Sequence, residues 1–366
     1  MPFAEQLKTF VTRFDPIYLS YLDDQIKSSR TINYQAEKNL IELKKLVAAG
    51  GKRLRPALAW AGASLFSLES QKPVWDLGIA LDLFHTFALI HDDIIDEADT
   101  RRGQMTMESS YRHYFTGILG DVRSRNHFAA AAAILGGDFA LVLADQIVSR
   151  INNQLVRDMY HQMQFELVAG QLDDCFGVGL SDLDELQEDQ VLKMLKNKSG
   201  NYSIQKPLLM GALFAFNSTD QDSWDVVKTD RKLKSLAEIG EKIGLVFQIT
   251  DDILGVFGDE AETGKSCISD IVEGKKTLLM LRTYAKLTTV EKLRMRNTLG
   301  SKDYKIEEIQ WLKDKIISTG TLAELQNMCL RLNDQAVQEL GNNFDTTNSG
   351  VEFITGLSEY LLTRKK

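Results

Sequence analysis

The hydrophobic pattern of the chain predicts an all-α protein. Apolar residues recur at helical spacing over long segments, and convincing strand-like alternation is missing. The chain holds five prolines, and none follows Pro207. Because no linker, low-complexity segment or short repeat divides the chain, we expect one domain spanning residues 1–366. Helices are expected at 3–30, 33–49, 57–66, 74–96, 127–149, 155–176, 188–216 and 232–256, with helical cover after a glycine-rich loop at 257–274.

Two of these helices are strongly apolar and end in aspartates. Residues 78–90 are apolar on nearly every face, which predicts a buried helix, and the run Asp92-Asp93-Ile94-Ile95-Asp96 follows soon after. On a helix Asp92 and Asp96 share one face, whereas Asp93 points about 100° away and is expected to support the pair. The helix at 232–256 ends in the second run, Asp251-Asp252.

Carboxylates at the ends of buried helices require cations or water. Two carboxylates on one face suit Mg²⁺ when a phosphate supplies further oxygens. If the two helices lie side by side with the same polarity, Asp92, Asp96 and Asp251 would face one another across a cavity, as in metal sites of helical bundles. A solvated acidic patch would explain either run alone, but it is a poor explanation for both together with the basic segments.

The basic residues near these runs form clusters, most of them at turns marked by Gly or Pro. Each cluster alone would be read as a solvated surface. Together they supply more positive charge than one phosphate group needs, which predicts a site for two diphosphates. The clusters are Lys52/Arg53/Arg55, Arg101/Arg102, Lys198, and Lys265 with Lys275/Lys276.

Composition narrows the class of protein further. The formal net charge of -8 argues against nucleic acid as a partner. No stretch of about eighteen or more apolar residues predicts a transmembrane segment, and no N-terminal run resembles a signal peptide. Cys175, Cys267 and Cys329 are isolated in the sequence, so we expect reduced thiols and a cytoplasmic location.

The order of the motifs resembles that of the trans-isoprenyl diphosphate synthases (polyprenyl synthetases). The resemblance rests on Gly50-Gly-Lys-Arg-Leu-Arg-Pro56, on the first aspartate run with Arg101-Arg102-Gly103, and on Phe247-Gln-Ile-Thr-Asp-Asp252, within a core at about 35–285. It implies an all-α bundle around a deep central cavity, usually homodimeric. It also implies a prenyltransferase that condenses isopentenyl diphosphate with an allylic diphosphate, using Mg²⁺ as three ions when substrate is bound.

The resemblance assigns roles to individual residues. His85 would otherwise be read as a core histidine, since it is a lone His on an apolar helix. The implied catalytic residues are Asp92, Asp96, Arg101, Arg102, Lys198 and Asp251. Lys52, Arg55, His85 and Arg102 would hold isopentenyl diphosphate; Arg101, Lys198, Ser199, Gln248, Lys265 and Lys275 would lie at the allylic diphosphate; and Asp92, Asp96 and Asp251 would bind Mg²⁺, supported by Asp93 and Asp252.

One position departs from the family pattern. The second run reads Asp251-Asp252-Ile253-Leu254-Gly255, where the family often has a third aspartate at the last position. This removes a carboxylate from the second metal site. We expect activity to survive, because Asp251 is the better candidate for a direct ligand.

The helix before Asp92 is expected to line the tunnel for the growing product. Phe87 lies five residues before Asp92 and Phe84 one turn earlier, so their rings are expected to limit chain length, whereas Ala88 leaves one side open. We therefore predict a short product, geranylgeranyl diphosphate with twenty carbons, and farnesyl diphosphate as the alternative.

Two other classes remain to be separated from this one. A class I terpene cyclase shares an aspartate-rich run and an all-α fold, but it would carry an Asn/Ser/Glu metal motif in place of Asp251-Asp252. An inactive subunit of a heteromeric synthase is suggested by Gly255. The complete first run and the basic residues argue against that reading.

Overall fold

The computed structural model confirms the all-α prediction. Helices account for nearly all of the secondary structure in the described residues, and the only strands there are two short ones. The termini of α4 and α11, the two helices that carry the aspartate runs, open into the same cavity. The described residues are 2–66, 72–101, 103–177, 180–216, 225–258, 268–301 and 303–364.

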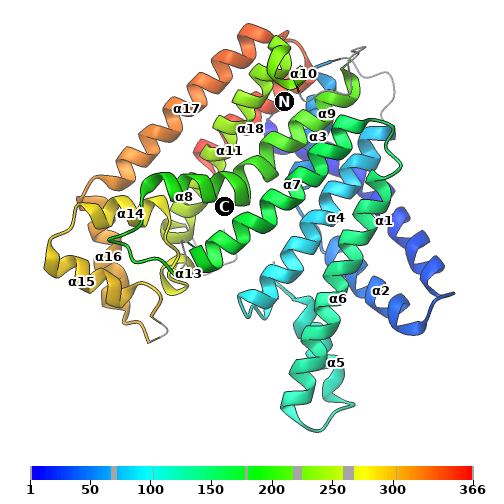
Figure 1. Ribbon diagram of the computed structural model, residues 1–366, viewed down its shortest axis with the longest axis horizontal. Helices are drawn as coiled ribbons and strands as arrows, with labels where there is room; N and C mark the ends of the chain where they lie inside the picture. Colours follow the sequence, from blue (N-terminus) through cyan, green and yellow to red (C-terminus); the bar gives the residue numbers. More distant parts are fainter. Residues whose placement is uncertain are drawn as a thin grey trace.

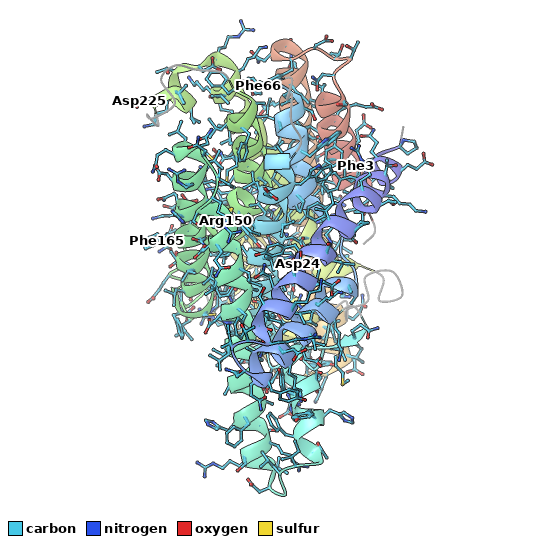
Figure 2. All side chains as sticks on the ribbon, turned by 90° about the vertical axis from the view of Figure 1, so that its right-hand side faces the viewer. Phe3, Asp24, Phe66, Arg150, Phe165 and Asp225 are labelled. Atoms are coloured by element: carbon cyan, nitrogen blue, oxygen red, sulfur yellow. The ribbon has the colours of Figure 1, made fainter. Side chains whose placement is uncertain are left out.

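The N-terminal half supplies the helices around the first aspartate run. Helix α1 is a single helix, and Figure 2 shows it crossing one face of the molecule from Phe3 to Asp24. Helix α4 packs between α3 and α6, which explains its apolar surface. The elements are α1 (Phe3–Ser29), α2 (Tyr34–Ala48), α3 (Leu54–Ser64), α4 (Lys72–Ile95), β1 (Thr100–Arg101), β2 (Gln104–Met105), α5 (Met107–Thr116), α6 (Val122–Val148) and α7 (Gln154–Leu172).

The C-terminal half supplies the second run and its cover. Helix α11 packs against α17, η2 and α18. The elements are η1 (Asp173–Gly177), α8 (Glu188–Leu195), η2 (Lys196–Gln205), α9 (Lys206–Ala215), α10 (Asp225–Thr229), α11 (Arg231–Phe257), α13 (Ser269–Val272), α14 (Leu278–Ala285), α15 (Thr289–Thr298), α16 (Ile306–Ser318), α17 (Thr321–Asn343) and α18 (Ser349–Thr363).

Three features differ from the sequence-based expectation. The segment between the first run and 127 contains a β-hairpin and helix α5, which the pattern did not predict. Helix α5 and the first turns of α6 project from the body as a hairpin (Figure 1). The predicted helix at 188–216 is divided into α8, the π-helical segment η2 and α9. Strands of two residues leave too little periodicity to be recognised in a sequence, and so does a π-helical segment, which differs from an α-helix by one extra residue in a turn.

Close backbone contact joins η2 to α11. A Cβ atom at Gly244 would lie 2.7 Å from the carbonyl oxygen of Gly200, and one at Gly240 would lie 2.8 Å from the Cα atom of Gln205. Only glycine allows backbones to approach this closely without displacement. The contact lies one turn before Gln248 and two turns before Asp251, so it positions the second run against η2.

Two described helices are long and apolar enough, by length and composition alone, to cross a membrane. They are α4 over Val74–Ile95 and α6, with 67% and 39% of the respective apolar windows buried inside the protein. Core helices meet the same criterion, so these two helices are weak evidence for a membrane span.

Candidate active site

One cavity of about 820 Å³ brings both aspartate runs together. Asp92 and Asp251 line it from the ends of α4 and α11, and basic residues predicted to bind diphosphate line it as well. Further lining residues include Lys52, Arg55, His85, Phe87, Ala88, Arg101, Gln171, Asp174, Tyr202, Ser203, Gln248, Asp252, Gly255, Asp270, Lys275 and Lys276.

The first run is held by a cation from the hairpin that follows it. The antiparallel pairing of Arg101 with Gln104 turns the chain back toward α4. Arg101 Nε donates to Asp93 Oδ1 at 2.7 Å, and its Nη2 lies 3.5 Å from Asp92 Oδ2. Gln171 Nε2, from α7, donates to the other oxygen of Asp92 at 3.3 Å. Asp93 is buried and directed to Arg101, whereas Asp92 faces the cavity.

Asp96 occupies a different environment from Asp92. Helix α4 ends at Ile95, but the Asp96 N–H still donates to the Asp92 carbonyl at 2.8 Å, so the last turn extends to this residue. Asp96 is exposed and does not line the cavity in the described structure. The two residues therefore share a helical turn, with Asp96 at the solvent side of the site.

The second run contains one exposed and one buried carboxylate. The Asp251 side chain is 59% exposed, and Arg364 Nη2 lies 3.3 Å from its Oδ1. Asp252 is 6% exposed, and Gln248 Nε2 donates to its Oδ1 at 2.9 Å. Its Oδ2 has no hydrogen-bond partner among the described residues. Burial, together with the nearby Asp270 carboxylate, raises the pKa of Asp252 well above the ordinary value.

Asp270 stands beside the position where the family often has a third aspartate. A Cβ atom added to Gly255 would overlap the Asp270 carboxylate, which comes from α13. Lys275 Nζ lies 3.0 Å from Asp270 Oδ1 and 2.8 Å from Glu273 Oε2. Burial alone would lower the pKa of Lys275, but these two carboxylates raise it overall, so the lysine stays charged. Gly255 thus leaves room for a carboxylate supplied by a later segment.

Three of the four predicted ligands of isopentenyl diphosphate line the cavity together: Lys52, Arg55 and His85, here called the basic clamp. Tyr202 of η2 joins two of them: its hydroxyl lies 3.0 Å from His85 Nδ1, and the Arg55 guanidinium lies 4.2 Å from its ring centroid. Arg55 also donates to Ser203 Oγ at 2.7 Å. These contacts hold the cationic groups at the cavity surface.

The C-terminal helix approaches both parts of the site. Lys52 Nζ lies 3.4 Å from the Tyr360 hydroxyl on α18. Arg364, just after α18, donates to the Phe247 carbonyl and to Thr250 Oγ1 at 3.0 Å each, and its guanidinium lies 4.9 Å from the Phe247 ring centroid. The Arg364 side chain is consequently almost fully buried.

Aromatic rings on α4 bound the apolar part of the cavity. Phe87 and Ala88 line it, as expected. Phe84 is fully buried behind Phe87, with ring centroids 5.5 Å apart, and also contacts the edges of Tyr160 and Tyr202. Phe84 therefore supports the Phe87 ring and does not itself reach the cavity surface.

Some predicted residues fall outside what the structure describes. Arg102 and Lys265 lie outside the described residues, and so does Cys267. Lys198 and Ser199 belong to η2, but their side chains are not among those described.

Sequence reasoning did not assign several residues that line or contact the site. Gln171 and Asp174 lie a turn apart at the end of α7 and in η1, and this spacing was the only available signal. The others are joined to the site by tertiary contacts alone: Tyr202, Ser203, Asp270, Tyr360 and Arg364.

These oxygen donors suit a hard cation whose coordination is completed by oxygens of the substrate. Asp92 and Asp251 present carboxylates to one cavity, and the buried Asp252 keeps an oxygen without a partner among the described residues. No three His, Cys, Asp or Glu side chains of the described chain converge closely enough to hold a metal by themselves. Mg²⁺ commonly binds in this way, through one or two carboxylates with phosphate oxygens and water.

The family model for polyprenyl synthetase matches residues 39–316, so the chain belongs to the polyprenyl synthetase family. It is 28% identical over 326 residues to geranylgeranyl diphosphate synthase of Saccharolobus solfataricus, covering 88% of this chain and 89% of that one. It is 30% identical over 300 residues to a short chain isoprenyl diphosphate synthase of Methanocaldococcus jannaschii, covering 81% of each.

A solved structure extends the likeness to the whole fold. Geranylgeranyl pyrophosphate synthase of Corynebacterium glutamicum, complexed with isoprenyl diphosphate and magnesium, superposes with a TM-score of 0.82 at 29% identity. The superposition covers 99% of this chain and 98% of that one. The chain is therefore a prenyltransferase of a family that uses isopentenyl and allylic diphosphates, and Mg²⁺ is the metal that this family and relative indicate.

Proposed function

We propose that the protein makes geranylgeranyl diphosphate from isopentenyl diphosphate and a shorter allylic diphosphate. The observation that carries this proposal is one cavity lined both by charged groups of both signs and by the Phe87 ring. Relatives named geranylgeranyl diphosphate synthase support the length of twenty carbons. Farnesyl diphosphate is the alternative product.

The basic clamp binds the diphosphate of isopentenyl diphosphate, assisted by Arg102. The allylic diphosphate lies between the two aspartate runs, where Arg101, Lys198, Ser199, Gln248, Lys265 and Lys275 contact it. Asp92, Asp96 and Asp251 would hold Mg²⁺, as three ions with substrate, and the metal would supply positive charge opposite the departing diphosphate. The opposed positions of the two diphosphates bring the isopentenyl double bond to the allylic carbon.

The apolar lining protects the allylic cation from water while the new bond forms. The allylic carbon–oxygen bond breaks, the isopentenyl double bond attacks the carbon, and the departing diphosphate takes the proton that is lost. Arg101 stays near the leaving group because Asp92 and Asp93 hold it from the other side. Preorganised cations of this kind stabilise developing negative charge without reorganisation during the reaction.

Phe87 limits the length of the product, and Phe84 supports it. Replacing Phe87 by Ala should open the cavity toward Phe84 and shift the products to longer chains. Phe84→Ala should act less strongly, because the Phe87 ring remains at the cavity surface. Liquid chromatography with mass detection of the products checks both variants. An unchanged product spectrum in Phe87→Ala would show that the Phe87 ring does not limit the length of the product.

The protein acts as a homodimer through one face of α6 and α7. Phe128, Leu135 and Val142 follow one another at seven-residue spacing on α6, and all three side chains are exposed. Figure 2 shows Phe165 at the outer edge of α7, where it is 74% exposed. Exposed apolar side chains gathered in this way are typical of an interaction surface. Sedimentation of the Leu135→Glu variant should show a monomer where the parent chain shows a dimer.

A cytoplasmic location fits the thiols. Cys175 and Cys329 lie in different parts of the fold, η1 and α17, and both are thiols in the structure. Reduced thiols are typical of the cytoplasm.

The deciding experiment uses the purified chain with Mg²⁺, isopentenyl diphosphate and, in separate reactions, each short allylic diphosphate. A product of twenty carbons supports the proposal in full. A product of fifteen carbons keeps the reaction and changes the product. The absence of any condensation would favour the reading as an inactive subunit, whereas cyclic hydrocarbon released from a prenyl diphosphate would favour a terpene cyclase.

A further inference from the structure

Arg53 lies between two residues of the basic clamp but faces the opposite way. Lys52 and Arg55 line the cavity, whereas the Arg53 side chain is 4% exposed and does not line it. The sequence groups these three cations as one cluster, and the structure divides them. A buried arginine beside a binding site needs a separate explanation, because burying its charge is costly unless partners compensate.

Three elements supply those partners. Arg53 Nε donates to Asp15 Oδ1 of α1 at 2.9 Å, and Nη1 donates to Asp82 Oδ2 of α4 at 2.7 Å. Nη2 donates to the Val47 carbonyl near the end of α2 at 2.6 Å. The guanidinium is a planar, rigid set of donors, so three bonds in different directions fix its position relative to all three helices.

The backbone at Arg53 is also specialised. Its φ and ψ of 47° and 36° are left-handed, which is uncommon for a residue with a side chain. This conformation lies immediately before α3, which begins at Leu54. It allows Lys52 and Arg55 to reach the cavity while the Arg53 side chain enters the core. Such a conformation persists where surrounding contacts determine it.

Asp82 links this anchor to the remaining clamp residue. It is buried on α4 and precedes His85 by three residues, so the two lie about one helical turn apart. Arg53 thereby joins the loop that carries Lys52 and Arg55 to the turn of α4 that carries His85. Asp15 adds α1, which lies outside the range matched by the family model.

We propose that Arg53 is a positioning residue for the isopentenyl diphosphate site, and that Asp15 and Asp82 act through it. The inference rests on the proposed roles of Lys52, Arg55 and His85. Arg53 does not touch substrate. It sets the spacing and direction of the cationic groups that do, and a displacement of such groups by about 1 Å is enough to weaken binding strongly.

The test compares two carboxylates of α1, each of which accepts a hydrogen bond from a cationic side chain. Asp15→Asn weakens the contact with Arg53. Asp23→Asn is the matched control, because Asp23 pairs with Lys44 of α2 at 2.6 Å and not with the loop that carries Lys52 and Arg55. In Asp15→Asn we expect KM for isopentenyl diphosphate to rise about tenfold, with KM for the allylic diphosphate and kcat nearly unchanged. Asp23→Asn should change none of the three constants.

Arg53→Lys provides a second measurement, because an ammonium cannot reproduce three bonds from one rigid plane. Its KM for isopentenyl diphosphate should rise further than that of Asp15→Asn, with folding followed by circular dichroism. A KM in Asp15→Asn equal to that of the parent would overturn the inference, as would equal losses for both substrates and kcat. If the parent chain itself makes no product, the proposed function fails, and the two failures are thus distinguishable.

Discussion

The two aspartate runs terminate similar helices but obtain their counter-charges in different ways. Helices α4 and α11 have 24 and 27 residues, and each delivers carboxylates at its C-terminal end. A helix C-terminus carries partial negative charge, so anions there are disfavoured unless cations lie near. The first run receives Arg101 from a hairpin that begins four residues after Asp96. The second receives Lys275 and also Arg364, which comes from the C-terminal end of the chain.

The first run takes its cation from the hairpin that follows it, whereas the second takes Arg364 from the C-terminal end of the chain. Asp92 and Asp93 share a single guanidinium, and together with it they form a compact group. Asp251 and Asp252 have separate partners, Arg364 and Gln248, and Asp252 also faces the carboxylate of Asp270. We therefore expect the second run to depend more on distant residues and on pH.

The largest expected effect comes from removing a charge that faces the cavity in either run. Asp92→Asn and Asp251→Asn should each lower kcat/KM by about 10²- to 10³-fold, the usual loss when one preorganised electrostatic group is removed. Steady-state rates at several Mg²⁺ concentrations measure this. Activity within threefold of the parent in either variant would show that the run concerned does not hold metal.

Replacing Arg101 and Arg364 in turn should show that the two runs differ in their contribution to stability. Arg101→Lys should lower kcat/KM by about tenfold or more and reduce the free energy of unfolding by about 1–3 kcal/mol, since the buried Asp93 loses its bond at 2.7 Å. Arg364→Lys should change stability less, because an ammonium can still donate to the Phe247 carbonyl or Thr250 Oγ1, and the carboxylate partner Asp251 is mainly exposed. Urea titrations of the two variants provide the comparison, and equal losses would contradict it.

An aspartate at position 255, where the family often has one, should lower the stability of this protein. Gly255→Asp places its Cβ in the space of the Asp270 carboxylate, so overpacking should reduce stability by about 1–3 kcal/mol. The double variant Gly255→Asp/Asp270→Gly should recover much of the loss. Thermal unfolding of the single and double variants measures the coupling. Additive losses would mean that the two positions do not share this space.

The smallest effect concerns the pH dependence of stability. Because the pKa of Asp252 is raised in the folded protein, the folded state holds the proton more tightly than the unfolded state. The free energy of unfolding therefore falls as the pH rises from the ordinary carboxyl pKa toward the raised one. Asp252→Asn removes this loss, so Tm of the variant relative to the parent should increase by about 1–2 °C between pH 4 and pH 7. A constant difference would assign the buried carboxylate an ordinary pKa.

Local patterns were sufficient to predict the all-α fold and most of the long helices. The periodicity of α4 and α11 is strong because each helix is packed on several sides. The convergence of the two runs on one cavity followed from their placement at the ends of such helices together with the family resemblance. The β-hairpin at Arg101 was not predicted, because two-residue strands have no measurable periodicity.

The direction of a side chain was harder to predict than its presence in the site. Arg53 stands between Lys52 and Arg55 in the sequence, yet it is buried. Its left-handed backbone and its partners Asp15, Asp82 and the Val47 carbonyl explain this. Phe84 was placed on the cavity surface, yet it lies behind Phe87. Charge and spacing identify candidates, but tertiary partners decide which way each one points.

The contact between Gly200 and Gly244 fixes a spacing that side-chain substitutions elsewhere do not change. Depth is set by rings such as Phe87, whose size changes with one substitution. The spacing of η2 and α11 at this contact is set by two backbones in van der Waals contact, so no side chain there can be trimmed to bring them closer. Variation among sequences with this geometry can therefore alter the length of the bound hydrocarbon while leaving the spacing of η2 and α11 unchanged.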